Sequence, residues 1–196
     1  MDYNFSVVHG EGLQSIMKEI ASLSVTVFRE YPYLFDGNVE EEKADLANFL
    51  SSQGSLAVVA KEGKKVIGAV TGKPLIETSD QIIKVFEEKG HSVHTMFYLM
   101  DLMLLKEYRG RGLGQKLYRS FEIHVKNHLQ FPTLAFCEVV RPREDTRRPA
   151  GLVGLDGFWK KSGFVKQPEM VTHFSWKEVD QPESRPNPMV FWLQQS

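Results

Sequence analysis

Residues 100–128 read MDLMLLKEYRGRGLGQKLYRSFEIHVKNH, and this stretch decides the fold. It begins inside a short apolar run, residues 95–105, which a single charge, Asp101, interrupts. The length of the run and the glycines that bound it favour a buried strand over a helix. Beyond the glycines, Leu113, Leu117, Phe121 and Val125 recur every four residues, which predicts a helix with one apolar stripe against a sheet.

The turn between strand and helix is rich in glycine and arginine, RGRGLG at residues 109–114. Glycine permits positive φ and lets another group approach the backbone closely. A helix start also leaves backbone N–H groups without intrahelical partners and carries partial positive charge. With Arg109 and Arg111 added, the turn is suited to a phosphate or pyrophosphate. The alternative is a tight turn whose arginines only increase solubility. The spacing fits neither the dinucleotide fingerprint nor the P-loop.

Arg109-x-x-Gly112-x-Gly114 after an apolar strand resembles the R/Q-x-x-G-x-G/A signature of the GNAT superfamily of acetyl-CoA-dependent acyltransferases. The resemblance implies that the turn holds the pyrophosphate of coenzyme A, that the preceding strand lies against the pantetheine arm, and that a backbone N–H near Leu104 is the oxyanion donor. The coenzyme-binding residues that it implies are Leu104, Leu105, Arg109, Gly110, Arg111, Gly112, Leu113, Gly114, Gln115 and Trp159.

Residues 155–164, LDGFWKKSGF, extend the resemblance. Phe158, Lys161, Gly163 and Phe164 fit the late F-Y-x-K-x-G-F segment of GNAT proteins, and Gly163 also suits a helix C-cap. Trp159 stands where many members carry the tyrosine assigned as the acid for the departing thiolate. An indole N–H only donates a hydrogen bond. Either another acid serves, or the thiolate leaves unaided, since a thiol with a pKa of about 8.5 needs little assistance.

The fold class expected is α/β (α+β): one GNAT domain over residues 1–196, with a central mixed, mostly antiparallel twisted sheet of about seven strands flanked by helices. A helical insertion at about residues 76–93 is interpreted as shaping the acceptor site or a homodimer contact. Besides the central elements, the patterns predict strands at residues 3–8, 55–60, 65–71, 133–140, 170–178 and 189–193, and helices at 13–28, 39–50 and 78–89.

Two carboxylates in apolar strands, Asp101 and Glu138, are candidate general bases, because burial brings a carboxyl pKa toward the working pH. A structural role, such as pairing with an arginine, is the alternative for each. In many relatives the acid lies at the position of Tyr98 or Met100, which in a regular strand faces away from Asp101. A β-bulge would bring them to one face. Tyr98 is the third candidate, as an acceptor-binding group or through water.

Two loops carry unusual compositions. Residues 31–35, YPYLF, hold four bulky apolar groups in five residues, which indicates either a core cap or the wall of an acceptor pocket. Residues 141–149, RPREDTRRP, contain four arginines and are interpreted either as an anion site or as an exposed loop.

The composition limits the function classes. The formal net charge of −1 argues against a nucleic-acid partner. The single cysteine, Cys137, excludes an internal disulfide. No signal peptide or apolar membrane-spanning segment is apparent, so a soluble, cytoplasmic protein without membrane partners is expected. His124 and His128 have metal-ligand spacing, but no third ligand is nearby, so no metal is expected.

Together these features predict an N-acetyltransferase of a bacterial GNAT subgroup whose acceptor is unassigned. The enzyme would use acetyl-CoA as co-substrate and acetylate a primary amine of a small molecule or peptide by direct transfer. The alternative is a non-catalytic acyl-CoA-binding regulator, which the missing tyrosine favours.

Overall fold

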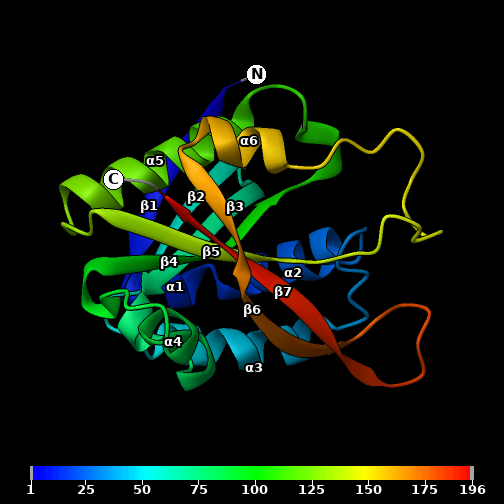
Figure 1. The fold of residues 1–196 in the computed structure, drawn as a ribbon. Helices are drawn as coiled ribbons and strands as arrows, with labels where there is room; N and C mark the ends of the chain where they lie inside the picture. The colour runs from blue at the N-terminus through cyan, green and yellow to red at the C-terminus, as the bar shows by residue number, and fades with distance from the viewer. Residues whose placement is uncertain (1, 195–196) are drawn as a thin grey trace.

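The computed structural model describes residues 2–194, without the side chains of residues 45, 48 and 50; residues 1, 195 and 196 of the expected domain lie outside this description. The strands form a seven-stranded sheet in the order β1-β2-β3-β4-β5-β7-β6 (Figure 1). The β4–β5 pair is parallel, and every other neighbouring pair is antiparallel. This confirms the predicted mixed, mostly antiparallel sheet.

The elements follow one another as the sequence patterns predict, with some changed bounds. The strands are β1 Tyr3–His9, β2 Leu56–Glu62, β3 Lys65–Pro74, β4 Met96–Leu104, β5 Thr133–Val139, β6 Phe164–Lys177 and β7 Ser184–Gln194. The helices are α1 Glu11–Ser15, α2 Met17–Phe28, α3 Val39–Leu50, α4 Asp80–Glu87, α5 Leu113–Asn127 and α6 Asp156–Lys161. Short 3₁₀ turns, η1 Leu75–Glu77, η2 Val93–Thr95 and η3 Lys106–Tyr108, connect them.

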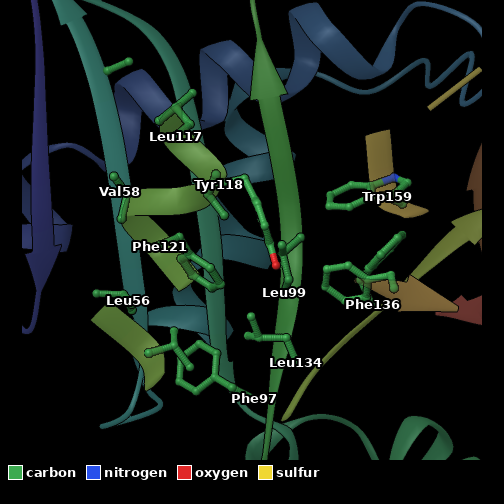
Figure 2. Close-up of a cluster of buried hydrophobic side chains, with 14 of the residues drawn as sticks. Leu56, Val58, Phe97, Leu99, Leu117, Tyr118, Phe121, Leu134, Phe136 and Trp159 are labelled. Carbon is green, nitrogen blue, oxygen red and sulfur yellow. The ribbon is translucent and has the colours of Figure 1, made fainter. Parts of the chain in front are cut away.

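Helices cover both faces of the sheet: α5 and α6 lie on one, and α1 to α4 lie on the other (Figure 1). The predicted apolar stripe of α5 is confirmed, since Leu113, Leu117, Phe121 and Val125 are all buried. Figure 2 shows Leu117 and Phe121 close to side chains of β2 and β4, among them Leu56, Val58, Phe97 and Leu99. These contacts hold the glycine turn against the end of β4.

Three predicted bounds differ from the structure by several residues. The strand expected from residue 189 begins at Ser184, because residues 184–188 continue the pairing with β6. The other two differences have local reasons. The expected helix over residues 13–28 is interrupted at Ile16, whose φ of −114° and ψ of 6° are not helical. Just before it, the Ser15 hydroxyl donates to the Gly12 carbonyl at 2.7 Å, and such local bonds compete with helix continuation. The strand expected from residue 170 begins at Phe164, because a register shift between Gln167 and Val171 lets β6 accommodate Pro168.

The central strand β4 contains the irregularity that matters most for the site. In its pairing with β3, Thr71 lies opposite Asp101 while Gly72 lies opposite Leu99, so Met100 is an extra residue. This bulge brings Tyr98 and Asp101 to the same face of the sheet, which a regular alternation would not do. On its other side, β4 pairs with β5 only over Met96–Tyr98 among the described residues. The two strands separate beyond that point.

Candidate active site

A cavity of about 460 Å³ lies where β4 and β5 separate. Tyr98, Met100 and Asp101 of β4 line it, together with Cys137 of β5. Ordinary small-molecule sites have volumes of this order and combine an apolar lining with a few polar groups. The bulge at Met100 therefore brings two of the three predicted catalytic candidates, Tyr98 and Asp101, into one cavity.

Asp101 is held by its neighbour on β3. The Thr71 hydroxyl donates to Asp101 Oδ2 at 2.8 Å. Burial in the cavity raises the pKa of Asp101 above its ordinary value, and the hydrogen bond from Thr71 partly opposes this rise. A carboxylate with a raised pKa and no ion-pair partner among the described residues is chemically suited to accept a proton from a substrate.

Tyr98 and Cys137 lie beside this carboxylate as a hydrogen-bonded pair. The Tyr98 hydroxyl and the Cys137 Sγ are 3.0 Å apart. Burial raises the pKa of the Cys137 thiol to about 12 and also raises the pKa of Tyr98. Since the thiolate is the nucleophilic form, Cys137 is unsuited to carry an acyl group at neutral pH.

Aromatic side chains form one wall of the cavity, supplied by Phe28, Tyr33, Phe35, Phe174 and Trp176. The rings of Phe28 and Tyr33 lie 4.7 Å apart edge to face, and the ring of Tyr33 lies 6.0 Å from that of Trp176. Trp176 Nε1 also donates to the Tyr33 carbonyl at 2.9 Å. Of the two interpretations of the aromatic loop at residues 31–35, the structure favours the pocket wall.

Other lining residues of the cavity are polar. Lys73 of β3 reaches it, as does Glu42 of α3, which accepts a 2.6 Å hydrogen bond from the Ser24 hydroxyl. Partial burial lowers the pKa of Lys73, and the charge of Glu77 opposes this. Ser79 and Ile82, from the segment between β3 and β4, also line the cavity. That segment, expected from the sequence as an insertion, thus contributes to the cavity.

Glu138 and Trp159 lie elsewhere. The Glu138 carboxylate forms a 2.6 Å ion pair with Lys166, which also lies 4.7 Å above the ring of Trp192. Trp159 is only 4% exposed and packs against Phe136 with ring centroids 4.2 Å apart, inside the cluster of Figure 2. Neither side chain lines the cavity. Glu138 thus has a cationic partner, and Trp159 is surrounded by core residues.

The glycine turn has the backbone that its sequence predicts. Gly110 and Gly112 both adopt a φ of +75°, and Gly112 is the N-cap of α5 without a side-chain cap among the described residues. The Lys116 N–H donates to the Gly112 carbonyl at 3.1 Å, which begins the helix. The amides of Leu113, Gly114 and Gln115 precede this bond and are positioned to bind an anion.

The arginines of the turn have partners within the protein. Arg109 pairs with Glu30 at 2.9 Å and donates through Nε to the Leu104 carbonyl at 2.9 Å. Arg111 donates to the Tyr3 hydroxyl at 3.2 Å. The Leu105 amide is also used, because it donates to the Ile67 carbonyl at 2.9 Å. The amides of the turn, rather than its guanidinium groups, are thus the groups most available to a phosphate.

The arginine-rich loop at residues 141–149 is fastened to the β6–β7 end of the sheet. Arg141 forms a 2.7 Å ion pair with Glu178, and Arg147 pairs with both Glu178 and Asp145. The pKa of Asp145 falls to about 2, mainly because of its hydrogen bond from Arg147. Because these guanidinium groups serve internal ion pairs, the anion-site interpretation of the loop gains no support.

Sequence patterns did not identify several groups at or beside the cavity, among them Thr71, Lys73 and Trp176. Thr71 and Lys73 lie in an apolar hairpin strand, and no local motif marks their side chains as facing a site. Trp176 lies in the alternating β6 pattern, which predicts a strand face but not which partner it meets. For the aromatic wall, the composition of the loop at residues 31–35 was the sequence signal, and it indicated Tyr33 and Phe35.

Potential metal ligands are scattered over the described residues. No three side chains of His, Cys, Asp or Glu come together there as a metal-binding group. The rings of His124 and His128 lie 4.9 Å apart on α5. Across residues 2–194, none of the helices combines the length and the apolar character that crossing a bilayer requires.

Comparison with solved structures shows the same fold in several acetyltransferases. The ribosomal-protein-alanine N-acetyltransferase of Brucella melitensis superposes with a TM-score of 0.62 at 13% identity, over 97% of this chain and 99% of that one. A putative acetyltransferase of Acinetobacter baylyi gives 0.64 at 14% identity, over 100% and 93%. The PaiA N-acetyltransferase of Thermoplasma acidophilum, in complex with coenzyme A, gives 0.58 at 13% identity over the whole of both chains.

Sequence comparison assigns the family. No curated protein matches the sequence. The model of the acetyltransferase (GNAT) family, however, matches residues 20–164, about three quarters of the chain, and includes β4, the glycine turn and α5. This match agrees with the fold and with the geometry of the turn. The chain belongs to the GNAT family of acetyltransferases.

Proposed function

We propose that this acetyltransferase transfers the acetyl group of acetyl-CoA directly to a primary amine bound in the cavity, with Asp101 as the general base. The observation that carries the proposal is the bulge at Met100, which brings Asp101 into the cavity at the point where β4 and β5 separate. A base, an amine-sized cavity and an unpaired strand edge then lie together. Holding two substrates in such a site supplies much of the rate enhancement.

Acetyl-CoA supplies an activated acetyl thioester, and the residues of this chain fit it. The amides of Leu113, Gly114 and Gln115 would hold the pyrophosphate, because no side chain among the described residues caps this helix start. The edge of β4 beyond Tyr98, which has no β5 partner, would hold the pantetheine arm. Backbone N–H groups on this edge are suited to donate to the thioester oxygen as negative charge develops there.

Asp101 would take the proton of the attacking amine. Its raised pKa makes it a better proton acceptor than an ordinary carboxylate, and Thr71 fixes its orientation. Tyr98 and Cys137 remain neutral and are positioned to orient the amine by hydrogen bonding. Because the Cys137 thiol is not ionised, direct transfer is favoured over an acyl-cysteine route.

The departing thiolate would leave without a protein acid. Trp159 is buried away from the cavity, and burial raises the pKa of Tyr33, so that its hydroxyl is a weak acid. A thiol pKa of about 8.5 makes the thiolate an adequate leaving group near neutral pH. The same absence of a tyrosine at position 159 is what favours the second candidate function, acyl-CoA binding without catalysis.

The decisive experiment measures acetyl-CoA-dependent release of free coenzyme A against a panel of primary amines. Asp101→Asn should lower kcat/KM by about 10²-fold or more, the range of general-base catalysis. The matched control is Glu138→Gln, the other acid in an apolar strand, which should remain within a few-fold of the wild type. Calorimetry should show acetyl-CoA binding by both variants. Binding without turnover of any amine would instead establish the regulator.

A further inference from the structure

The lining of the cavity bears on the choice of acceptor. Five aromatic side chains line the cavity together with the Asp101 carboxyl, and the ring of Tyr33 packs against those of Phe28 and Trp176. Cys137 lines the same cavity, so base, thiol and aromatic side chains border one space. A molecule whose amine meets Asp101 therefore has its next atoms against aromatic rings.

The charges around the cavity disfavour an acceptor with several positive groups. Among the described lining residues the acids are Asp101 and Glu42, and the base is Lys73. Asp101 is required for the amine that reacts. Glu42 keeps its negative charge, since its partner Ser24 is neutral, and the positive charge of Lys73 offsets it. Apart from Asp101, the lining therefore carries no net negative charge that would attract the second ammonium group of a linear polyamine.

From this arrangement, and resting on the proposed function, we infer that the acceptor is a small primary amine that carries an aromatic group and no second positive charge. The ring would pack against Phe28, Phe174 and Trp176, which combine apolar area with faces that attract an ammonium group. A volume of about 460 Å³ accommodates a molecule of one ring and a short side chain.

The inference is tested by binding, which does not depend on turnover. Calorimetry is carried out on the full chain in complex with coenzyme A, with 2-phenylethylamine, spermidine and an alanine-initiated tripeptide as probes. We expect 2-phenylethylamine to bind at least tenfold more tightly than either of the others. Equal or tighter binding of spermidine or the tripeptide would overturn the inference.

Variants of the aromatic side sharpen the test. Phe174→Ala should weaken 2-phenylethylamine about tenfold and leave spermidine unchanged. Phe28→Leu keeps most of the apolar volume and should therefore fold normally. It should give a smaller loss of affinity for 2-phenylethylamine than Phe174→Ala does. Val171→Ala, on the same strand β6 and outside the cavity, is the control and should change neither affinity. An unchanged affinity in both aromatic variants would overturn the inference.

A charge reversal tests the discrimination against polyamines. Lys73→Glu should bring spermidine binding up by about tenfold, whereas Lys64→Glu in the exposed β2–β3 turn should not. Failure of the proposed function gives a different result: no coenzyme A is released with any amine, although the order of binding affinities stands. The inference about the acceptor is wrong if spermidine or the tripeptide binds more tightly than 2-phenylethylamine, whether or not turnover occurs.

Discussion

The two faces of strand β4 perform different tasks. Phe97 and Leu99 point toward α5 and are almost completely buried in the cluster of Figure 2. Tyr98 and Asp101 point the other way and line an open cavity. One strand therefore supplies a packed core on one side and a chemically active surface on the other. The difference comes from what covers each face: a long apolar helix on one side and several shorter elements with loops on the other.

The comparison shows why one extra residue has a large effect. In a regular strand Asp101 would share the face of Leu99 and enter the core below α5. The bulge at Met100 shifts the alternation of side chains by one residue. Leu102 and Leu104 therefore face the core below α5, and Asp101 faces the same side as Tyr98. A carboxylate is thus excluded from the core and placed in the cavity by backbone geometry.

The largest effect is expected on the cavity face. Asp101→Asn should reduce kcat/KM by about 10²- to 10⁴-fold, the range for removal of a general base. Folding raises the pKa of Asp101, so the folded chain binds the proton more tightly than the unfolded chain does. The folded chain therefore loses stability as the pH rises from the unfolded-state pKa of Asp101 through its folded-state pKa. Asn cannot ionise, so the melting temperature at pH 7 should be equal to or higher than that of the wild type. A loss of both activity and stability would contradict this role.

On the packed face the effect should be on stability alone. Leu99→Ala removes a fully buried side chain between α5 and the sheet and should cost about 2–5 kcal/mol of unfolding free energy. Urea denaturation measures this cost. In the fraction that remains folded, KM for the acceptor should be unchanged, because Leu99 does not reach the cavity. If KM for the acceptor rose instead, the two faces would not be independent.

A smaller change tests the support of the base. Thr71→Val removes the hydroxyl that donates to Asp101, and this donation holds the pKa of Asp101 down. The pKa should then rise further. Because the base acts when ionised, activity is lost as the pH falls through that pKa, so the acidic limb of the kcat/KM profile should move up by as much as about one pH unit. If the acidic limb of the kcat/KM profile did not move, a group other than Asp101 would be responsible for it.

The smallest effect is expected at Cys137. Its thiol pKa of about 12 keeps it neutral, and serine can replace its hydrogen bond with Tyr98. Cys137→Ser should therefore keep kcat/KM within about three-fold of the wild type, since a neutral hydrogen bond contributes little on net. An acetylated Cys137 detected by mass spectrometry during turnover would refute direct transfer.

Local patterns were sufficient wherever a segment determines its own structure. The α3 bounds, Val39–Leu50, agree with the sequence because Asn38 caps the first turn by accepting from the amides of Glu40 and Glu41. The apolar stripe of α5 and the positive φ of Gly112 follow from residue type and spacing in the same way. Patterns failed at Ile16 and at the start of β6, where a hydroxyl bond and a bulge change the backbone.

By itself, the sequence determined the order of the elements, the strand–turn–helix at residues 95–127 and the positive φ of the glycines in its turn, because these depend on neighbours within a few residues. Only the tertiary structure decided which face Asp101 occupies, that Glu138 is paired with Lys166, and that the turn arginines are engaged by Glu30 and Tyr3. The physical reason is that a charged side chain selects its partner in space. The partners named here lie 28, 79 and 108 positions away along the chain, and the face of Asp101 depends on the register between β3 and β4.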